Sequence, residues 1–429
     1  MIRMVAVSLT AGALMVVPAL PACAQQTVRI PARDRTLTGK PVELYSIGRE
    51  EGEDWELLAG VRQVAFDASE NLYVLDSGNQ RVLVFDANGR FLRQIGRKGE
   101  GPGELMSPLG MTVTQNGEVI VSDLGRQAYS IFKTDGSFVR NVTPEVSDFG
   151  AFASQIYEHP AGIVSRHRPM VMMARNVEAG RPAMPTTGPE KMQVTLTDLK
   201  TAKRSTLWEI TLPEQPTKVS EQSSGPSQRS FRVIRSTPEF MPPVLMGVVP
   251  GGAIAVASEA DYRIRITSNG GVQRVIERPI APRKVGRREQ NLARERRRSE
   301  MSSGRTPRMA IAVRAESGGR PSVSTAAPPA MTPAQIEAEL QNLTFMDYVP
   351  VLSGMVTDPL GRIWLKRTAN DLGDGGPIDL ITHDGRYIGS IPGLQLPVVV
   401  SRGGRAAWIE RDDMGVERVV VKRLPASWR

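Results

Sequence analysis

Asp76 and Asp123 are the first side chains whose type and position could support chemistry, because each carboxylate closes a run rich in apolar residues. Aspartates at equivalent strand ends can line one rim of a fold and bind Ca²⁺, an ion that takes about six to eight oxygen ligands. A strand-end aspartate also commonly accepts hydrogen bonds from the amides of its own turn. The rest of the chain does not repeat this aspartate clearly. We therefore expect turn aspartates, with calcium binding as the alternative.

The chain is poorly equipped for other catalytic chemistry. Its histidines are His159, His167 and His383, and the first and last lie in predicted turns, whereas a zinc enzyme normally needs about three well-placed ligands. The glycine-rich residues 96–103 lack the following Lys-Ser or Lys-Thr pair of a phosphate-binding loop, so we interpret them as a connector. A Gly-x-Ser-x-Gly motif is missing as well. We assign no catalytic, metal-binding or cofactor-binding residue.

Most of the formal charge of +9 lies in one basic segment, residues 283–308, where ten Lys or Arg stand against three Glu. Four of its arginines are candidates for contact with an anionic partner such as a lipid headgroup: Arg294, Arg296, Arg297 and Arg298. A solvated segment without a partner is the alternative. Nucleic acid is disfavoured, because the rest of the chain is near neutral and has no extended basic face.

Cys23 is the only cysteine, which excludes an intramolecular disulfide. Residues 1–24 combine one early arginine, a short apolar run and small residues, as is typical of a secretory signal peptide, here cleaved after Ala24. The alternative is a lipoprotein, since Leu20-Pro-Ala-Cys23 resembles a lipobox and Cys23 would then carry the acyl chains. We expect export to the periplasm or the extracellular space, or a lipid anchor at the membrane.

Two stretches of the chain repeat one pattern. Any functional site must be positioned by the structural elements that this pattern forms. Residues 61–76 align without a gap on residues 108–123, and the register continues with Gly89 on Gly136. Short apolar runs and turn residues that recur with a period of about 40 to 50 residues are typical of propeller blades. The sequence therefore predicts an all-β ring of blades over residues 27–429.

The first repeat can be compared with a known family. Asp76-x-x-Asn79-x-Arg81, followed by Phe85 and Gly89-x-Phe91, resembles the NHL repeat of six-bladed β-propellers. The resemblance is weaker in the second repeat, where Arg126 and Ala128 replace Asn79 and Arg81. It implies six blades. Some relatives are metal-dependent lyases or calcium-dependent lactonases, and their ligand sets cannot be mapped onto this chain.

The rest of the chain can be divided into blades by the spacing of its apolar runs and turn residues. We predict that the blades begin near residues 61, 108, 152, 244, 349 and 397. Residues 42–47 form an N-terminal strand that is expected to close the last blade, because closure removes a free sheet edge. Residues 212–229, rich in Pro, Ser and Gln, are expected to be a loop.

A basic insertion at residues 281–346 separates blades four and five. Residues 284–302 favour a solvated or partner-facing helix, and residues 303–329 have a composition typical of disorder. Thr332 with Gln335 three residues later, and Pro333 between them, predicts the capped start of a second helix. We expect that helix to lie on the propeller.

These observations favour an exported propeller that binds or scaffolds an envelope protein and is not a catalyst. An enzyme remains the alternative, as a hydrolase or lyase at one mouth of the channel with Ca²⁺ as its cofactor. Three carboxylate or amide side chains converging at the channel mouth would favour the enzyme.

Overall fold

The computed structural model describes most of the chain. The described residues are 25–144, 152, 155–167, 191–213, 217–223, 229–235, 237–268, 271–302, 310–314, 322–326, 331–412 and 414–428. The predicted signal peptide, including Cys23, lies outside them. Among the described residues, no helix has the length and apolar character required to cross a membrane.

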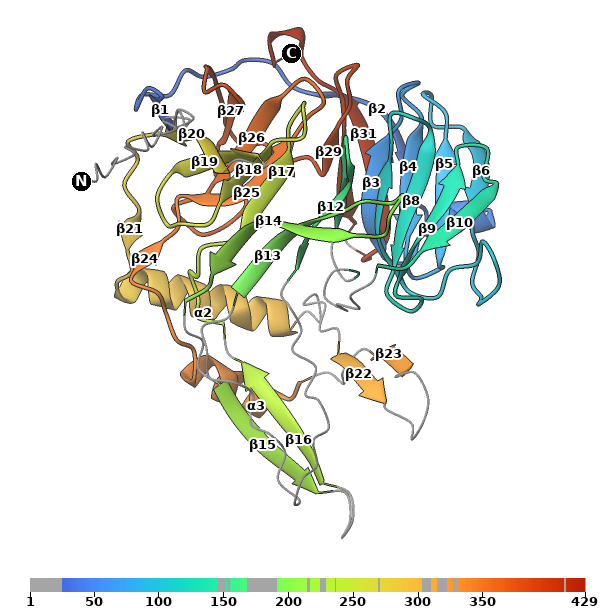
Figure 1. The fold of residues 1–429 in the computed structure, drawn as a ribbon. Coiled ribbons are helices and arrows are strands. Elements are labelled where there is room, and N and C mark those ends of the chain that lie inside the picture. Colours follow the sequence, from blue (N-terminus) through green and yellow to red (C-terminus); the bar gives the residue numbers. More distant parts are fainter. Residues whose placement is uncertain are drawn as a thin grey trace, which may run out of the picture.

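The two repeats form two similar four-stranded antiparallel sheets, drawn in blue and cyan in Figure 1. Blade one contains β3 (Val61–Phe66), β4 (Leu72–Asp76), β5 (Arg81–Phe85) and β6 (Phe91–Ile95). Blade two contains β7 (Pro108–Val113), β8 (Glu118–Asp123), β9 (Ala128–Lys133) and β10 (Phe138–Val142). Their middle strands are buried, as expected for strands covered by neighbouring blades.

The repeat extends to single backbone angles. Gln80 and Gln127 occupy equivalent turn positions, and both have φ of 54°. Glu70 has φ of 64°, and its equivalent Gly117 has φ of 79°. A left-handed conformation is uncommon for residues other than glycine, so its recurrence at matching positions shows that the two blades share one turn geometry.

Four further sheets continue the series. Blade three contains β11 (Ile156–His159), β12 (Gly162–His167), β13 (Lys191–Thr197) and β14 (Arg204–Thr211), and blade four contains β17 (Leu245–Val248), β18 (Ile254–Ala257), β19 (Arg263–Ser268) and β20 (Gly271–Glu277). Blade five contains β25 (Leu352–Thr357), β26 (Arg362–Arg367), β27 (Ile378–Thr382) and β28 (Tyr387–Ile391), and blade six contains β29 (Val399–Val400), β30 (Arg405–Arg411), β31 (Glu417–Arg423) and β2 (Val42–Ile47).

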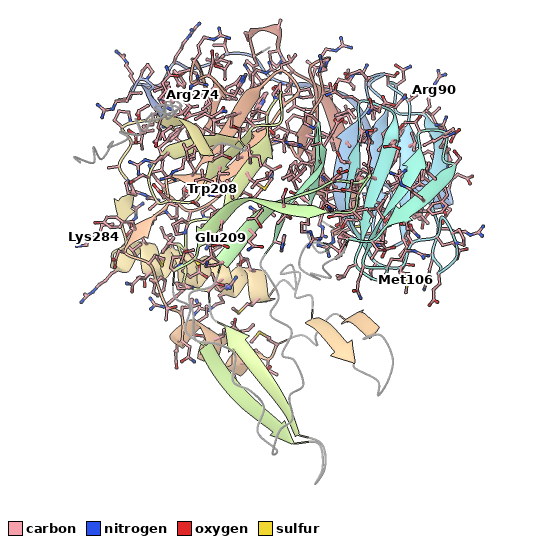
Figure 2. The ribbon with its side chains drawn as sticks, viewed as in Figure 1. Arg90, Met106, Trp208, Glu209, Arg274 and Lys284 are labelled. Atoms are coloured by element: carbon pink, nitrogen blue, oxygen red, sulfur yellow. The ribbon has the colours of Figure 1, made fainter. Side chains whose placement is uncertain are left out.

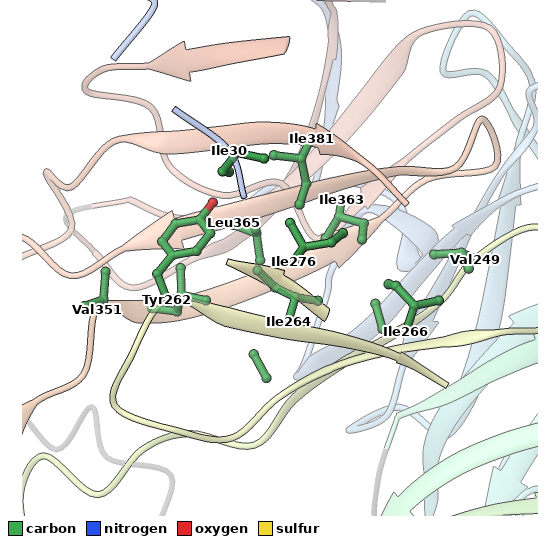
Figure 3. Packing of buried hydrophobic residues seen from close by; sticks show 13 residues of the cluster. Ile30, Val249, Tyr262, Ile264, Ile266, Ile276, Val351, Ile363, Leu365 and Ile381 are labelled. Atoms are coloured by element: carbon green, nitrogen blue, oxygen red, sulfur yellow. The ribbon is translucent and has the colours of Figure 1, made fainter. Parts of the chain in front are cut away.

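The six sheets close into a ring. The first strands of successive blades contact one another in the cycle β3, β7, β11, β17, β25, β29 and back to β3. Strand β2 pairs antiparallel with β31, so the start of the chain completes the last blade as predicted. Each pair of neighbouring blades buries one apolar cluster between its sheets, and Figure 3 shows the cluster between blades four and five. The fold is a six-bladed β-propeller.

An N-terminal strap precedes the closing strand and was not predicted. Strand β1 (Gln26–Arg29) adds in parallel to β20, which makes blade four five-stranded. The chain then bridges from Thr36 to Ser390 of blade five before it reaches β2. We call residues 26–37 the strap.

The insertion between blades four and five contains two helices, α2 (Arg287–Ser302) and α3 (Pro333–Gln341), and begins and ends with the short strands β21 (Arg283–Lys284) and β24 (Tyr348–Val349). The predicted capping box of Thr332 and Gln335 is present. The predicted contact of α3 with the propeller is wrong, because Ile336 and Leu340 of α3 pack against Met301 of α2.

Two segments predicted to lack secondary structure contain hairpins. Strands β15 (Thr217–Ser223) and β16 (Arg229–Arg235) pair within and beyond the expected loop at residues 212–229. Strands β22 (Ala310–Arg314) and β23 (Ser322–Ala326) pair within the expected disordered stretch. Their composition predicted loops, because the first segment is rich in Pro, Ser and Gln and the second in Gly, Ser, Pro and Ala. Two 3₁₀ turns, at Asp54–Glu56 and Ala426–Trp428, complete the structure.

Candidate interaction face

The antiparallel order of each blade separates two kinds of loop. The turns between first and second strands, and between third and fourth strands, lie at one end of the ring, which we call the turn face. The turns between second and third strands, and the links to the next blade, lie at the other end, which we call the connector face. Among the described residues, helices α2 and α3 and the two extra hairpins belong to links between blades, so they gather on the connector face (Figure 1).

The turn face consists of tight hairpins. Asp67, Asp86 and Asp358 each begin such a turn, and each carboxylate accepts the backbone amides two and four residues further on. This local bonding fixes each turn with few residues. The turn face therefore offers short, rigid loops, whereas the connector face offers long ones.

Asp76 and Asp123 lie on the connector face and fasten the links between blades. Asp76 is fully buried and accepts hydrogen bonds from the Ala59 amide at 2.9 Å and from Arg81 Nε at 3.0 Å. Asp123 is also buried and accepts the amides of Met106 and Ser107, each at 2.8 Å. Both carboxylates accept backbone amides of the preceding connector. Within their own turns, Asp123 accepts the Arg126 backbone amide as predicted, whereas Asp76 accepts the side-chain amide of Asn79.

A hollow of about 440 Å³ opens on the connector face between blades six and one. It is formed by the link that follows β2 and by the turn between β30 and β31. Its lining residues are Arg49, Glu50, Leu57, Leu58, Ala59, Gly60, Arg411, Gly415, Val416 and Glu417. Next to it Met414 is 71% exposed, an unusual exposure for a large apolar side chain. The sequence did not predict this hollow, because its two walls come from opposite ends of the chain.

Glu417 holds the two walls of the hollow together. Its carboxylate accepts the amides of Gly60 and Val61, at 2.8 and 2.7 Å, and forms an ion pair with Arg411. Burial would raise the pKa of Glu417, but the Val61 amide and the Arg411 guanidinium outweigh burial, so the pKa is lowered. The carboxylate thus stays ionised and spans the seam where the ring closes.

The predicted anionic-partner arginines all make contacts within the chain. Arg296 Nη2 lies 2.8 Å from a carboxylate oxygen of Glu239, and Arg297 Nε lies 3.6 Å from the other. Arg298 pairs with Glu337 of α3 at 2.8 Å, and the guanidinium of Arg294 lies over the ring of Phe345 at 5.1 Å. Binding of an anionic partner by these arginines stays a prediction. In the structure, Arg296 and Arg297 link α2 to Glu239, and Arg298 links α2 to α3. Lys284, before α2, points away from the body (Figure 2).

Two of the histidines contact the carbonyls of neighbouring turns. His159 Nε2 lies 3.0 Å from the Gly252 carbonyl, and its Nδ1 accepts the Ala161 amide, which fixes the neutral tautomer. Burial lowers the pKa of His159 accordingly. His383 Nδ1 lies 3.1 Å from the Gly361 carbonyl. In the described part of the chain, His, Cys, Asp and Glu side chains do not gather in groups of three or more that could hold a metal ion.

The glycine-rich residues 96–103 form the link between blades one and two, as predicted. Arg126 donates to the Gly101 carbonyl at 2.8 Å, and Glu104 accepts the Gly101 amide, also at 2.8 Å. These bonds shape the link.

Comparison with known proteins agrees with the class that this fold defines. A family model described as 6-bladed beta-propeller, DUF5128, matches residues 51–155, which comprise blades one and two. The protein is therefore a six-bladed β-propeller, and its first two blades are its NHL-like part.

Two curated proteins match parts of the chain. The protein brain tumor of Drosophila melanogaster is 31% identical over 102 residues, which are 23% of this chain and 9% of the fly protein. The human E3 ubiquitin-protein ligase NHLRC1 is 32% identical over 59 residues, 14% of this chain and 15% of the human protein. The chain thus spans less than a sixth of either relative.

Solved structures match over nearly the whole chain but at low identity. A predicted exported protein of Bacteroides fragilis has a TM-score of 0.46 at 13% identity, covering 93% of this chain and 100% of that one. A gluconolactonase of Xanthomonas campestris has a TM-score of 0.40 at 10% identity, covering 85% of this chain and 86% of that one.

Proposed function

We propose that this propeller is exported and acts as a non-catalytic binding module, with an envelope protein docking on the connector face. The observation that supports the proposal is the segregation of loops, since the long links and insertions share one end of the ring and tight turns occupy the other. Rigid scaffolds commonly present variable loops in this way for recognition. The hollow beside Met414 offers apolar surface within that face.

Export is part of the same proposal. The first described strand begins at Gln26, two positions after the predicted cleavage site at Ala24. Cleavage there would leave every described strand intact. Acylation of Cys23 would place the propeller at the membrane by the same route, and mass spectrometry of the mature N-terminus distinguishes the two forms.

Site-specific photo-crosslinking tests the docking face. A photoreactive amino acid replaces Met414 on the connector face, and in a matched variant it replaces Leu360, which is 47% exposed on the turn face. We expect discrete crosslinked species in the native envelope from position 414 and none above background from position 360. Equal products from both positions, or none from 414 and from a second probe at Leu57, would contradict the proposed face.

A further inference from the structure

The strap is bound to blades four and five as a peptide ligand is bound to a receptor. Blade four already has four strands without it, and β1 adds a fifth along the outer edge in the register Gln26 to Arg274 through Arg29 to Glu277. The Ile30 amide then donates to the Glu277 carbonyl at 2.9 Å. Addition of an extended segment to an existing sheet edge is a general mode of peptide recognition.

Two apolar side chains of the strap fill positions on the propeller. Ile30 is 4% exposed and joins the cluster between blades four and five, where it lies near Ile381 (Figure 3). Leu37 is 8% exposed and packs in the cluster between blades five and six. The intervening residues 31–36 are exposed, so the strap is anchored at its two ends.

Two arginines of the propeller, Arg278 and Arg367, hold the middle of the strap, and we call this pair the clasp. Asp34 receives Arg278 Nη2 on one carboxylate oxygen and Arg367 Nη2 on the other, each at 2.6 Å. Arg278 also donates to the carbonyls of Pro31 and Ala32, at 2.9 and 3.3 Å. Burial would raise the pKa of Asp34, but Arg367 and Arg278 outweigh it and the pKa is lowered.

Contacts with the propeller, and not with the strap, hold Arg278 of the clasp in position. The guanidinium of Arg278 is fully buried, lies 4.7 Å from the ring centre of Tyr387 and pairs with buried Asp379 at 2.5 Å. Ser390 donates to the other oxygen of Asp379, also at 2.5 Å. Residues of blade five therefore hold Arg278 in place. Its remaining N–H groups bind the strap through one carboxylate, that of Asp34, and two backbone carbonyls.

We propose that this outer site on blades four and five is a peptide-binding site, and that the strap of a second copy of this chain can occupy it in place of the chain's own. The ligand chemistry is an extended segment with an apolar residue, an acidic residue four positions later and an apolar residue three positions after that. Only residues 38–41 join the strap to β2, and Gly39 and Pro41 lie among them. Exchange of an identical element across such a short hinge links protomers without new contacts.

Mixed disulfide formation tests the exchange. In a Cys23→Ser background, one chain carries Gln26→Cys and a second chain carries Arg274→Cys, which are partners in the strand register. The two are mixed at about 0.1 to 1 mM, because a tethered strap competes at an effective concentration in the millimolar range. We expect a covalent dimer containing one of each chain, and an excess of a synthetic peptide of residues 25–38 should suppress it.

Matched variants decide the outcome. Arg90→Cys, on an exposed turn of blade one (Figure 2), replaces Arg274→Cys to report random collision. A single chain carrying both Gln26→Cys and Arg274→Cys should link within itself, which shows that the pair can bond. If that chain links while the mixed pair gives no more dimer than the Arg90→Cys control, the second copy does not enter the site and the proposal fails.

A second measurement needs no disulfide. Fluorescence anisotropy follows a labelled peptide of residues 25–38 on the full chain whose own strap carries Asp34→Ala. The unmodified peptide should bind, and a peptide with Asp34→Ala should bind about ten-fold more weakly or worse, because it lacks the charge-assisted bonds of the clasp. Absence of binding at millimolar peptide, or equal affinity of the two peptides, would overturn the assignment. Neither experiment depends on the partner proposed for the connector face.

Discussion

At the scale of single residues, Gln63 connects three blades near the centre of the ring. The first strand of each blade pairs on one side only, so its other edge presents backbone groups to the channel. Gln63 Oε1 accepts the Met111 amide of blade two at 3.0 Å, and Nε2 donates to the Ile156 carbonyl of blade three at 2.9 Å. One side-chain amide thus satisfies backbone groups of two neighbouring blades.

Replacement of Gln63 should destabilise the ring. Gln63→Leu keeps similar volume but leaves buried backbone groups unpaired, which costs about 1–3 kcal/mol in free energy of unfolding. Urea denaturation measures the loss. Gln94→Leu is the control, because Gln94 is exposed and bonds only the Gly96 carbonyl, so its effect should stay within about 0.5 kcal/mol. Equal stability of the two variants would mean that water replaces the amide at position 63.

Residue types alone predicted the setting of the aspartates but not all of their partners. Asp76 was expected at a strand end because of the turn that follows it, and it lies there. Its bond to the Ala59 amide joins positions 17 apart, and such a bond depends on how the connector returns to the blade. The positive charge of the arginines in α2 was likewise evident from the sequence. Their partner Glu239 could not be predicted, because it lies 57 positions before Arg296.

At the scale of elements, α2 is held to the propeller by a buried carboxylate and a small apolar cluster. Glu239 is 8% exposed and faces Arg296 and Arg297. Phe240 and Leu372 pack in the cluster beside α2, with φ of 65° and 61°. Bulky residues adopt this left-handed conformation only where surrounding contacts enforce it, so docking of α2 helps to hold both backbones in place.

Removal of the buried carboxylate should loosen α2 and leave the ring folded. In Glu239→Ala, Arg296 and Arg297 lose the partner that ties them to a residue outside α2, while Glu300 within α2 still pairs with both. Amide hydrogen exchange in α2 should therefore accelerate about ten-fold or more. Glu337→Ala is the matched control, since Glu337 pairs with Arg298 on the surface and exposed pairs contribute little. Unchanged exchange in Glu239→Ala would show that the apolar cluster alone holds the helix.

Elements whose stabilising contacts are local in sequence were predicted correctly, whereas elements that depend on distant partners were missed. The cap of α3 was correctly predicted because Thr332, Pro333 and Gln335 encode it within four residues. The pairing of strand β1 with blade four was missed because its hydrogen-bonding partner lies in β20, far along the chain. The hairpin of β15 and β16 was missed because the Pro, Ser and Gln content of residues 212–229 predicted a loop.

At the scale of the whole molecule, stability depends on the seam between blades six and one. Ile47 of β2 is 4% exposed and packs in the cluster that joins these two blades. Val42, in the same strand, is 65% exposed. Within β2, Ile47 therefore contributes to packing between blades six and one, whereas Val42 does not.

A pair of alanine substitutions measures this dependence. Ile47→Ala should lower the free energy of unfolding by about 2–5 kcal/mol, because it leaves a cavity in a packed cluster, whereas Val42→Ala should change it by less than about 0.5 kcal/mol. Trp55 lies in the cluster between blades six and one, and Trp208 in the cluster between blades three and four, whereas Trp364, Trp408 and Trp428 share the cluster between blades five and six. Their fluorescence should shift at one common midpoint. A shift confined to blade six would contradict closure as the source of global stability.

The pairing of β2 with β31 also sets the order of events during biosynthesis. Strand β2 is synthesised long before its partner β31, and contacts between strands so distant in sequence form slowly. Blade six therefore stays incomplete until β31 has been synthesised. A truncated polypeptide that lacks residues 417–423 would leave β2 as an unpaired edge, a substrate for quality-control proteases.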